Sequence, residues 1–129
     1  PTWQEVDGSR FSSKATDFGD AILARKDAPA SYHLSCVVDD AAGGVTTVVR
    51  GADLRPSTPI QRLLQILLGL TEPTYLHHPL ITHEDGRRLA KRDLAPTLAA
   101  MRDTGVDGRT LAYDLMAGKL PLGFAFRDE

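Results

Sequence analysis

The densest group of charged side chains lies in a basic segment in the second half of the chain. Residues 82–92 form a polar stretch around an Asp-Gly pair, a combination that marks a turn. Its cations are Arg87, Arg88, Lys91 and Arg92. The formal net charge of the whole chain is −2, so any contact with RNA would have to come from a local basic patch. The alternative interpretation is an ordinary solvated loop.

Side chains that could bind a metal do not form a convincing set. The four histidines have the surroundings of surface or strand-end residues. Asp39 and Asp40 are adjacent, but neighbouring acids at a helix end more often have a structural role. Cys36 is the only cysteine, so an intrachain disulfide is impossible and nothing indicates an oxidising compartment. The sequence therefore predicts no metal site and favours a cytoplasmic protein.

The composition is that of an ordinary globular protein. The chain has 129 residues, of which 42% are hydrophobic and 25% charged, enough for one modest domain or a piece of a larger one. No apolar run approaches the roughly 20 residues that span a bilayer, and we expect no membrane partner. The first five residues, PTWQE, contain neither an initiator Met nor a signal-peptide pattern, which favours a fragment of a longer protein.

The elements that must position these residues can be read from periodicity and turn signals. In chain order we expect a loop over 1–16, a strand over 20–25, a helix over 32–41, a strand over 45–50, a helix over 58–69, a strand over 75–81, the basic loop 82–92, short helices over 93–105 and 107–118, and an irregular tail.

The best-marked element is the helix that begins near residue 58. Thr58 is its expected N-cap, Pro59 its first helical residue, Gln61 the partner in a capping box, and Gly69 its end. Its expected apolar face consists of Ile60, Leu63, Leu64 and Leu67. The order of elements is typical of half of a doubly wound α/β fold, in which parallel strands are buried on both faces. We expect the missing strands to lie upstream.

Three segments resemble the glutamyl-tRNA synthetases and their glutamyl-queuosine relatives. Residues 31–40, SYHLSCVVDD, resemble the family run Y-[HQ]-L-x-x-V-V-D-D. Residues 44–54, GVTTVVRGADL, followed by STP at 57–59, resemble G-[VI]-T-x-V-x-R-G-x-D-L…S-T. Residues 79–81, PLI, with DGRRLAKR at 85–92, resemble the class I signature loop written KMSKS. The match extends from roughly residue 17 to residue 105.

The resemblance implies an α/β fold: the second half of a class I synthetase Rossmann-like catalytic domain followed by short C-terminal helices. Residues 1–30 would be a remnant of the inserted subdomain, 31–92 the half catalytic domain with the signature loop, and 93–129 C-terminal helices and tail. It also implies an aminoacyl-tRNA synthetase-like ligase that uses ATP with Mg²⁺ to form glutamyl-adenylate and passes the glutamate to tRNA.

Residue roles follow from the resemblance in the same way. Lys91 would be the catalytic cation beside the phosphates of ATP, where a positive charge lowers the barrier. Arg50 would bind the side-chain carboxylate of glutamate, a task for which a planar bidentate donor is suited. Tyr32 would hold the glutamate through its hydroxyl. The alternatives are a solvated lysine, a strand-end salt bridge and a tyrosine packed in the core.

The same family pattern implies contacts with ATP from the signature loop, from residues 79–81 just before it and from the motif at residues 44–54. The residues concerned, besides Lys91, are Asp53, Leu80, Ile81, Arg88 and Leu89. A helix-cap role competes for Asp53, and the side chains of Leu80 and Ile81 could simply belong to the core.

Several departures from the family pattern bear on function. Ala90 replaces the serine of the signature loop, and Arg88 stands where its first lysine would be. Cys36 occupies a position where glutamyl-tRNA synthetases often have asparagine, which favours the glutamyl-queuosine enzymes. The chain contains no HIGH signature, and a zinc site would require an upstream cysteine-rich segment. We therefore expect this chain alone to be inactive and to need the N-terminal half of the same protein.

The preferred acceptor is the queuosine of tRNA(Asp). The chain ends shortly after the signature loop, whereas a discriminating glutamyl-tRNA synthetase would continue into an anticodon-binding region. The alternatives are a fragment of such a glutamyl-tRNA synthetase, a non-catalytic nucleotide- or RNA-binding paralogue, and a generic RNA-binding loop. A half-sheet with open edges could also dimerise.

Overall fold

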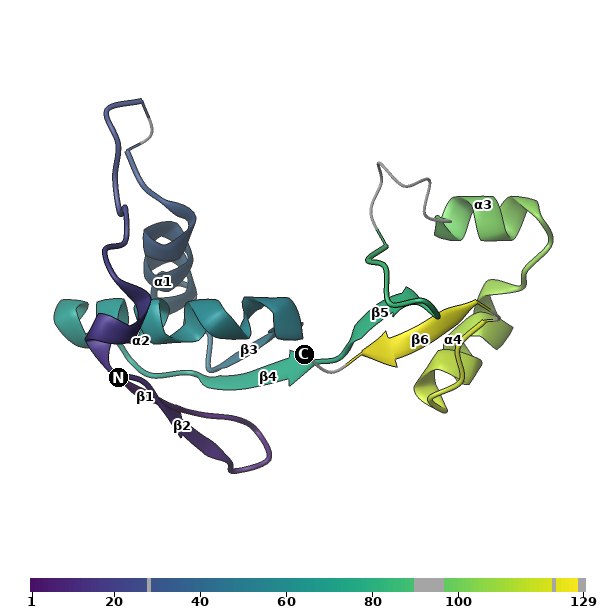
Figure 1. Ribbon diagram of the computed structural model, residues 1–129, viewed down its shortest axis with the longest axis horizontal. Coiled ribbons are helices and arrows are strands. Elements are labelled where there is room, and N and C mark those ends of the chain that lie inside the picture. Colours follow the sequence, from purple (N-terminus) through teal and green to yellow (C-terminus); the bar gives the residue numbers. More distant parts are fainter. Residues whose placement is uncertain (28, 90–96, 122, 128–129) are drawn as a thin grey trace. The chain divides into compact units, whose positions relative to one another are not determined.

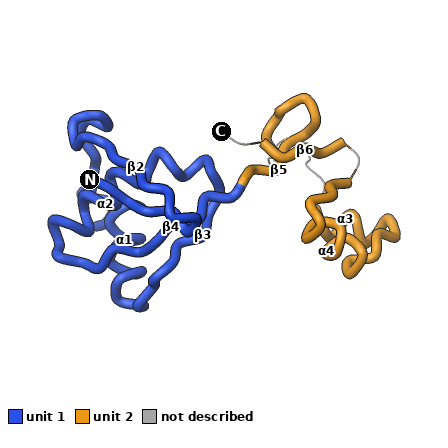
Figure 2. Tube along the Cα trace, turned by 90° about the horizontal axis from the view of Figure 1, so that it is seen from below, with its two compact units in different colours: residues 1–78 blue, residues 79–129 orange. Residues whose placement is uncertain are grey.

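The computed structural model describes residues 1–27, 29–89, 97–121 and 123–127. The chain folds as two compact units, Pro1–His78 and Pro79–Glu129 (Figure 2). Within the described residues, no helix is long and apolar enough to cross a membrane.

The centre of unit 1 is a parallel pair of strands. β3 (Thr47–Gly51) lies beside β4 (Thr74–His78), as the sequence predicted for this pair, with Arg50 opposite His77. The opposite edge of β4 is occupied by the chain just after β1 (Thr2–Gln4), because Glu5 bridges to Tyr75 and the amide of Val6 donates to the Tyr75 carbonyl at 2.9 Å. β4 is therefore central in unit 1, with β3 on one side and the N-terminal segment on the other (Figure 1).

Two helices of eleven residues accompany this sheet, and both form where the sequence places them. α1 (Tyr32–Ala42) begins after Ser31, whose hydroxyl accepts from the amide of Leu34, and ends at Gly43. α2 (Thr58–Leu68) ends at Gly69, whose φ of 66° is a left-handed conformation that glycine adopts without strain. α1 packs against α2, and side chains of α2 contact those of β3 and β4.

The start of α2 differs from the prediction. The N-cap position is Ser57, and Thr58 is already helical. A 3₁₀ helix, η2 (Ala52–Ser57), leads directly into α2, so the first amides do not depend on a capping box. The predicted apolar face is also wrong in part, since Leu67 is exposed, whereas Gln61 and Gln65 are buried. The buried face of α2 is polar because it faces the polar side chains of β3 and β4.

The N-terminal segment contains more structure than the predicted loop. β1 and β2 (Arg10–Ser12) form an antiparallel hairpin in which Trp3 stacks on Phe11, and a 3₁₀ turn, η1 (Ala15–Phe18), follows. The strand predicted over residues 20–25 is absent, because this stretch adopts no regular structure. Strands of three residues are too short to leave a clear alternation in the sequence.

The burial expected of β3 is only partly realised. The strand begins two residues later than predicted, and its residues are half-buried or exposed, with Val49 63% exposed. Val49 points to the face opposite Arg50, because side chains alternate along a strand. In the described part of unit 1, no further strand or helix covers Val49 enough to bury it.

Unit 2 contains an antiparallel pair of strands and two short helices. The predicted strand over residues 75–81 divides at Pro79 into β4 and β5 (Leu80–His83). β5 pairs with β6 (Phe124–Arg127), so the predicted irregular tail ends in a strand that the short FAFR run did not reveal. α3 (Leu98–Asp103) and α4 (Gly108–Met116) confirm the two predicted helices, although the expected start of the first, at 93–96, lies outside the described residues.

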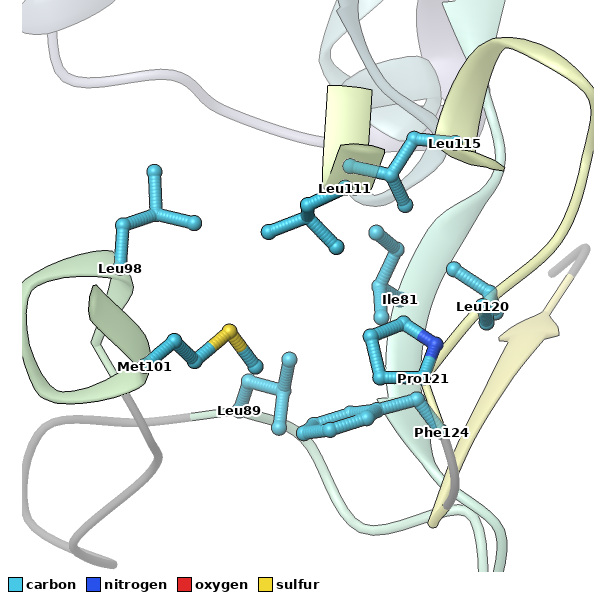
Figure 3. Close-up of a pocket in the computed structure, with 9 residues that line it drawn as sticks. All are labelled: Ile81, Leu89, Leu98, Met101, Leu111, Leu115, Leu120, Pro121 and Phe124. Atoms are coloured by element: carbon cyan, nitrogen blue, oxygen red, sulfur yellow. The ribbon is translucent and has the colours of Figure 1, made fainter. Parts of the chain in front are cut away.

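Apolar side chains of unit 2 surround a cavity of about 130 Å³. Figure 3 shows them pointing toward one another from β5, the segment after it, α3, α4 and the C-terminal segment. The lining residues are Ile81, Leu89, Leu98, Met101, Leu111, Leu115, Leu120, Pro121 and Phe124. The cluster gathers apolar side chains of unit 2, although several of them, such as Leu98 and Ile81, remain partly exposed.

Candidate substrate-binding site

Arg50 lies near the end of β3 and is held by three hydrogen bonds. Its Nε donates to Nε2 of His77 at 3.0 Å, its Nη1 to Oε1 of Gln61 at 2.6 Å, and its Nη2 to Oγ1 of Thr58 at 2.7 Å. Each guanidinium nitrogen therefore has one partner inside unit 1. A guanidinium has five N–H groups, so one N–H on each Nη has no acceptor among the described residues.

The ring of Tyr75 completes the surroundings of Arg50. The guanidinium carbon lies 5.2 Å from the ring centroid, a distance at which a cation is attracted to an aromatic face. The hydroxyl of Tyr75 accepts from Nε2 of Gln65 at 3.2 Å, which fixes the ring from α2. Burial raises the pKa of Tyr75, so the ring stays neutral beneath the cation.

His77 takes part through one defined tautomer. The Nε–H of Arg50 can only donate, so Nε2 of His77 must carry a lone pair. The ring proton then sits on Nδ1, which donates to Oε1 of Glu5 at 2.7 Å. The other oxygen of Glu5 accepts from the backbone amide of His77 at 3.3 Å. Arg50 thus donates to His77, and His77 in turn donates to Glu5.

Burial favours the neutral form of His77. Desolvation is the largest cause that lowers the pKa of His77, and the nearby charges of Arg50 and Arg55 act in the same direction. The hydrogen bond and charge of Glu5 act in the opposite direction, and the net pKa is below the ordinary value. A neutral ring is what the hydrogen bond from Arg50 requires.

Gln61 is oriented by the same guanidinium. Because Arg50 donates to its carbonyl oxygen, the amide nitrogen must point the other way. That nitrogen is buried and has no hydrogen-bond partner among the described residues. A buried donor left unsatisfied is costly, so the amide of Gln61 is available to an acceptor that enters the site.

Tyr32 is the first residue of α1 and is 55% exposed. Its hydrogen bond with Cys36, one turn further along α1, is the largest cause that raises its pKa. The positive charge of Arg50 is among the causes that lower it, so the two side chains lie within electrostatic range. Both residues expected at the glutamate site thus belong to unit 1, and the core position considered for Tyr32 does not occur.

The residues expected to contact ATP belong to both units. Asp53 lies exposed in the first turn of η2 in unit 1. Leu80 and Ile81 are in β5, and the side chain of Ile81 contributes to the apolar cavity together with Leu89 (Figure 3). Ile81 and Leu89 thus both line the apolar cavity of unit 2.

The first part of the basic loop forms a tight turn. The amide of His83 donates to the carbonyl of Arg87 at 3.0 Å, and Gly86 has a φ of 81°. Arg87 forms an ion pair with Asp85 at 2.7 Å on the surface. Arg88 is exposed, and its backbone forms an isolated antiparallel β-bridge with Thr82. Ala90 and Lys91, including the proposed catalytic cation, lie outside the described residues.

Sequence reasoning missed the residues that hold Arg50. It placed all four histidines at the surface or at strand ends, but His77 is only 9% exposed. It assigned Thr58 and Gln61 to helix capping and gave Glu5 no role. One signal was available in the two predicted strands. If β3 and β4 pair in parallel, His77 lies opposite Arg50 and their side chains share one face of the sheet. Among the described residues, no three His, Cys, Asp or Glu side chains are grouped as a metal site.

Comparison with known proteins defines the family. Residues 3–116 match the model of the class I tRNA synthetase catalytic domain for glutamate and glutamine (E and Q). The chain therefore belongs to the class I glutamyl- and glutaminyl-tRNA synthetase family.

Among curated proteins, the chain is similar to glutamyl-Q tRNA(Asp) synthetases. The chain is 56% identical over 86 residues to a glutamyl-Q tRNA(Asp) synthetase of Nocardia farcinica, covering 67% of this chain and 28% of the relative. It is 50% identical over 103 residues to the glutamyl-Q tRNA(Asp) synthetase of Rhodobacter capsulatus, covering 80% and 36%. The chain thus spans about a third of the length of these relatives.

Solved structures show the same class of fold. A glutamate tRNA ligase of Elizabethkingia meningosepticum, crystallised with its amino acid, superposes with a TM-score of 0.62 and 27% identity. The superposition covers 82% of this chain and 20% of that ligase. Such class I enzymes have mixed helix and strand content, as this chain does.

Proposed function

We propose that this chain is part of an enzyme that activates glutamate with ATP and transfers it to tRNA, with the queuosine of tRNA(Asp) as the acceptor. The observation that carries the proposal is the fixed guanidinium of Arg50, which retains two N–H donors for a carboxylate. The acceptor is inferred from the 56% and 50% identity to the glutamyl-Q tRNA(Asp) synthetases of Nocardia farcinica and Rhodobacter capsulatus, against 27% to the glutamate tRNA ligase of Elizabethkingia meningosepticum.

Arg50 is proposed to bind the side-chain carboxylate of glutamate. Its remaining donors belong to one planar group whose orientation is already set, so little rotamer entropy is lost on binding. Tyr32 offers a hydroxyl within range of the Arg50 charge, and Gln61 offers an unsatisfied amide. Aspartate has a side chain one methylene shorter and would reach these donors less well.

ATP is proposed to bind on the side chains and backbone of the signature segment. Lys91 and Arg88 would neutralise its phosphates, Asp53 would lie near the nucleotide, and the backbone at Leu80 and Ile81 would lie beside the adenine. Leu89 would support the loop from the apolar cavity. In the reaction, the α-carboxylate of glutamate attacks the α-phosphate of ATP and pyrophosphate leaves. A cation beside the phosphates stabilises the negative charge that develops in this step.

The metal requirement follows from the donors present. Mg²⁺ would be held mainly by the phosphates of ATP, since it keeps much of its water and needs few protein ligands. The described residues do not fit a zinc site, because Cys36 is the single cysteine and no ligand cluster is present among them. No step is therefore assigned to zinc in this chain.

We infer that β3, β4, α1 and α2 belong to half of a Rossmann-like catalytic domain over residues 31–92. A remnant of an inserted subdomain over 1–30 precedes it, and C-terminal helices and a tail over 93–129 follow it. The parallel pairing of β3 and β4 supports this interpretation. A cytoplasmic location remains a prediction.

The test is transfer of labelled glutamate by the protein expressed from the complete reading frame. ATP-dependent labelling of tRNA(Asp) that contains queuosine, with none of the queuosine-free tRNA(Asp), would support the proposal. Arg50→Ala and Lys91→Ala should each abolish most of it, whereas Lys26→Ala, at a surface lysine in unit 1, should not. Labelling of tRNA(Glu) instead would favour a glutamyl-tRNA synthetase.

A further inference from the structure

We propose that Glu5 and His77 are positioning residues, which hold the Arg50 guanidinium in the orientation that receives the substrate carboxylate; this rests on the proposed function. Neither is expected to touch the substrate. Their action passes through one hydrogen bond, from Nε of Arg50 to Nε2 of His77.

The direction of the protons supports this role. Nδ1 of His77 can donate to Glu5 only if the ring proton is there, and Nε2 then has a lone pair for Arg50. The carboxylate of Glu5 therefore selects the tautomer that Arg50 needs, as outer partners of metal-bound histidines do. The hydrogen bond at Nε, together with those at Nη1 and Nη2, leaves the guanidinium plane a single orientation.

The location of Glu5 favours a positioning role over simple stability. Its side chain is 9% exposed and comes from the N-terminal segment, 72 residues before His77. Burying a carboxylate against a neutral ring costs desolvation energy, and apolar residues of similar volume often serve stability as well. A buried polar chain that ends at the candidate substrate ligand is the arrangement expected of support for a functional residue.

Burial and two nearby cations favour a neutral His77 ring. The ring of Tyr75 stacks on it at 5.9 Å between centroids, the Thr58 hydroxyl lies 3.3 Å from Nε2, and Arg50 and Arg55 add positive charge. Only Glu5 favours protonation. A proton on Nε2 would place two donors and two positive charges against each other, so acid should release Arg50 from its orientation.

The test uses two substitutions of His77. In His77→Gln, the side-chain carbonyl can accept from Nε of Arg50 in place of Nε2, whereas His77→Phe keeps a ring but has no acceptor. NMR of the isotope-labelled chain would report the His77 tautomer and the exchange rate of the Arg50 Nε–H. We expect the Nδ1–H tautomer, slow exchange in wild type and His77→Gln, and exchange about tenfold faster in His77→Phe.

The functional measurement is glutamylation by the protein of the complete reading frame. His77→Phe should raise KM for glutamate about tenfold, which corresponds to about 1.4 kcal/mol, with a smaller change in kcat. His77→Gln should rescue KM, and the rise in KM with falling pH should be weaker in His77→Gln than in wild type. Glu5→Gln should resemble a mild form of His77→Phe.

A matched control separates positioning from loss of stability. Glu72→Gln removes the 2.7 Å ion pair with Arg62 in the same unit but leaves the Arg50 partners in place, so it should change neither the Arg50 signal nor KM. A proton on Nε2 of His77, or an Arg50 signal unchanged in His77→Phe, would overturn the inference. If wild type showed the expected NMR pattern but transferred no glutamate, the positioning would stand and the proposed function would fail.

Discussion

The hydroxyl of Thr58 lies 2.7 Å from Nη2 of Arg50, although Thr58 is the first residue of α2 and precedes a proline. The first turn of a helix is thereby used to hold a strand residue instead of capping its own amides. Gln61, one turn further, does the same for Nη1 at 2.6 Å. The helix start and the candidate substrate ligand are therefore one structural unit.

Replacing Thr58 with valine tests this relationship. Valine has nearly the same shape, but it leaves Nη2 of Arg50 without its acceptor beside a fully buried position. We expect the free energy of unfolding to fall by about 1–3 kcal/mol, measured by urea denaturation with the fluorescence of Trp3, the single tryptophan. Ser57→Ala, at the N-cap without a side-chain cap bond, should change it by less than about 0.5 kcal/mol. A larger loss of stability in Ser57→Ala than in Thr58→Val would show that these hydroxyls serve helix capping and do not hold Arg50.

The charge of Arg50 should not be enough without its geometry. A lysine at this position keeps the charge but cannot reach His77, Gln61, Thr58 and a carboxylate together. We expect Arg50→Lys to weaken glutamate binding at least about tenfold in the complete protein, measured by calorimetry. Arg10→Lys, at an exposed residue of β2, is the control and should leave binding unchanged. Equal affinity of wild type and Arg50→Lys would remove Arg50 from the site.

The hydroxyl of Tyr32 should matter for binding but little for folding. Tyr32 is 55% exposed, so Tyr32→Phe removes its bond to Cys36 without opening a cavity. We expect unfolding to change by less than about 0.5 kcal/mol and glutamate affinity to fall about five- to tenfold. Tyr113→Phe, on the exposed side of α4, provides the matched control. An affinity unaffected by Tyr32→Phe would assign the hydroxyl to α1 alone.

The stability of unit 1 should depend on pH through His77. Its pKa is lowered in the folded chain, so the unfolded chain binds a proton more readily. Stability is therefore complete above the ordinary pKa of 6.5 and falls as the pH decreases below it, by no more than about 1.4 kcal/mol per pH unit.

The pH range in which His77 affects stability is separate from the range in which the surface carboxyls do. Hydrogen bonds to Ser9, Arg87 and Thr110 lower the pKa values of Asp7, Asp85 and Asp107 below 3.8, so their effects appear only in stronger acid. His77→Gln should flatten the loss between pH 6.5 and 5 when unfolding is followed by Trp3 fluorescence. A loss of equal size in His77→Gln would assign the effect to another group.

Elements marked by local signals could be predicted from the sequence. Gly69 was expected to end α2 and Asp107 to begin the helix that became α4, and both do so. The β-branched run TTVV predicted β3 to within two residues. Arg50 and Tyr32 were named through motifs, and the structure brings them within electrostatic range.

The support of the site could not be predicted, because it depends on long-range pairing. Glu5 reaches His77 only once the N-terminal segment has joined the free edge of β4. The polar face of α2 follows from what it contacts, which no helical periodicity records. β6 is a four-residue strand, and even its nearest pairing with β5 in the sequence, Phe124 opposite His83, joins residues 41 positions apart.

Transfer of labelled glutamate to queuosine-containing tRNA(Asp), by the complete protein and its Arg50→Ala variant, tests the central claim most directly. The account predicts ATP-dependent labelling in wild type, none of tRNA(Asp) without queuosine, and a loss of at least about a hundredfold in kcat/KM for glutamate in the variant. Labelling that persists in Arg50→Ala, or no labelling of this tRNA by the wild type, would contradict it.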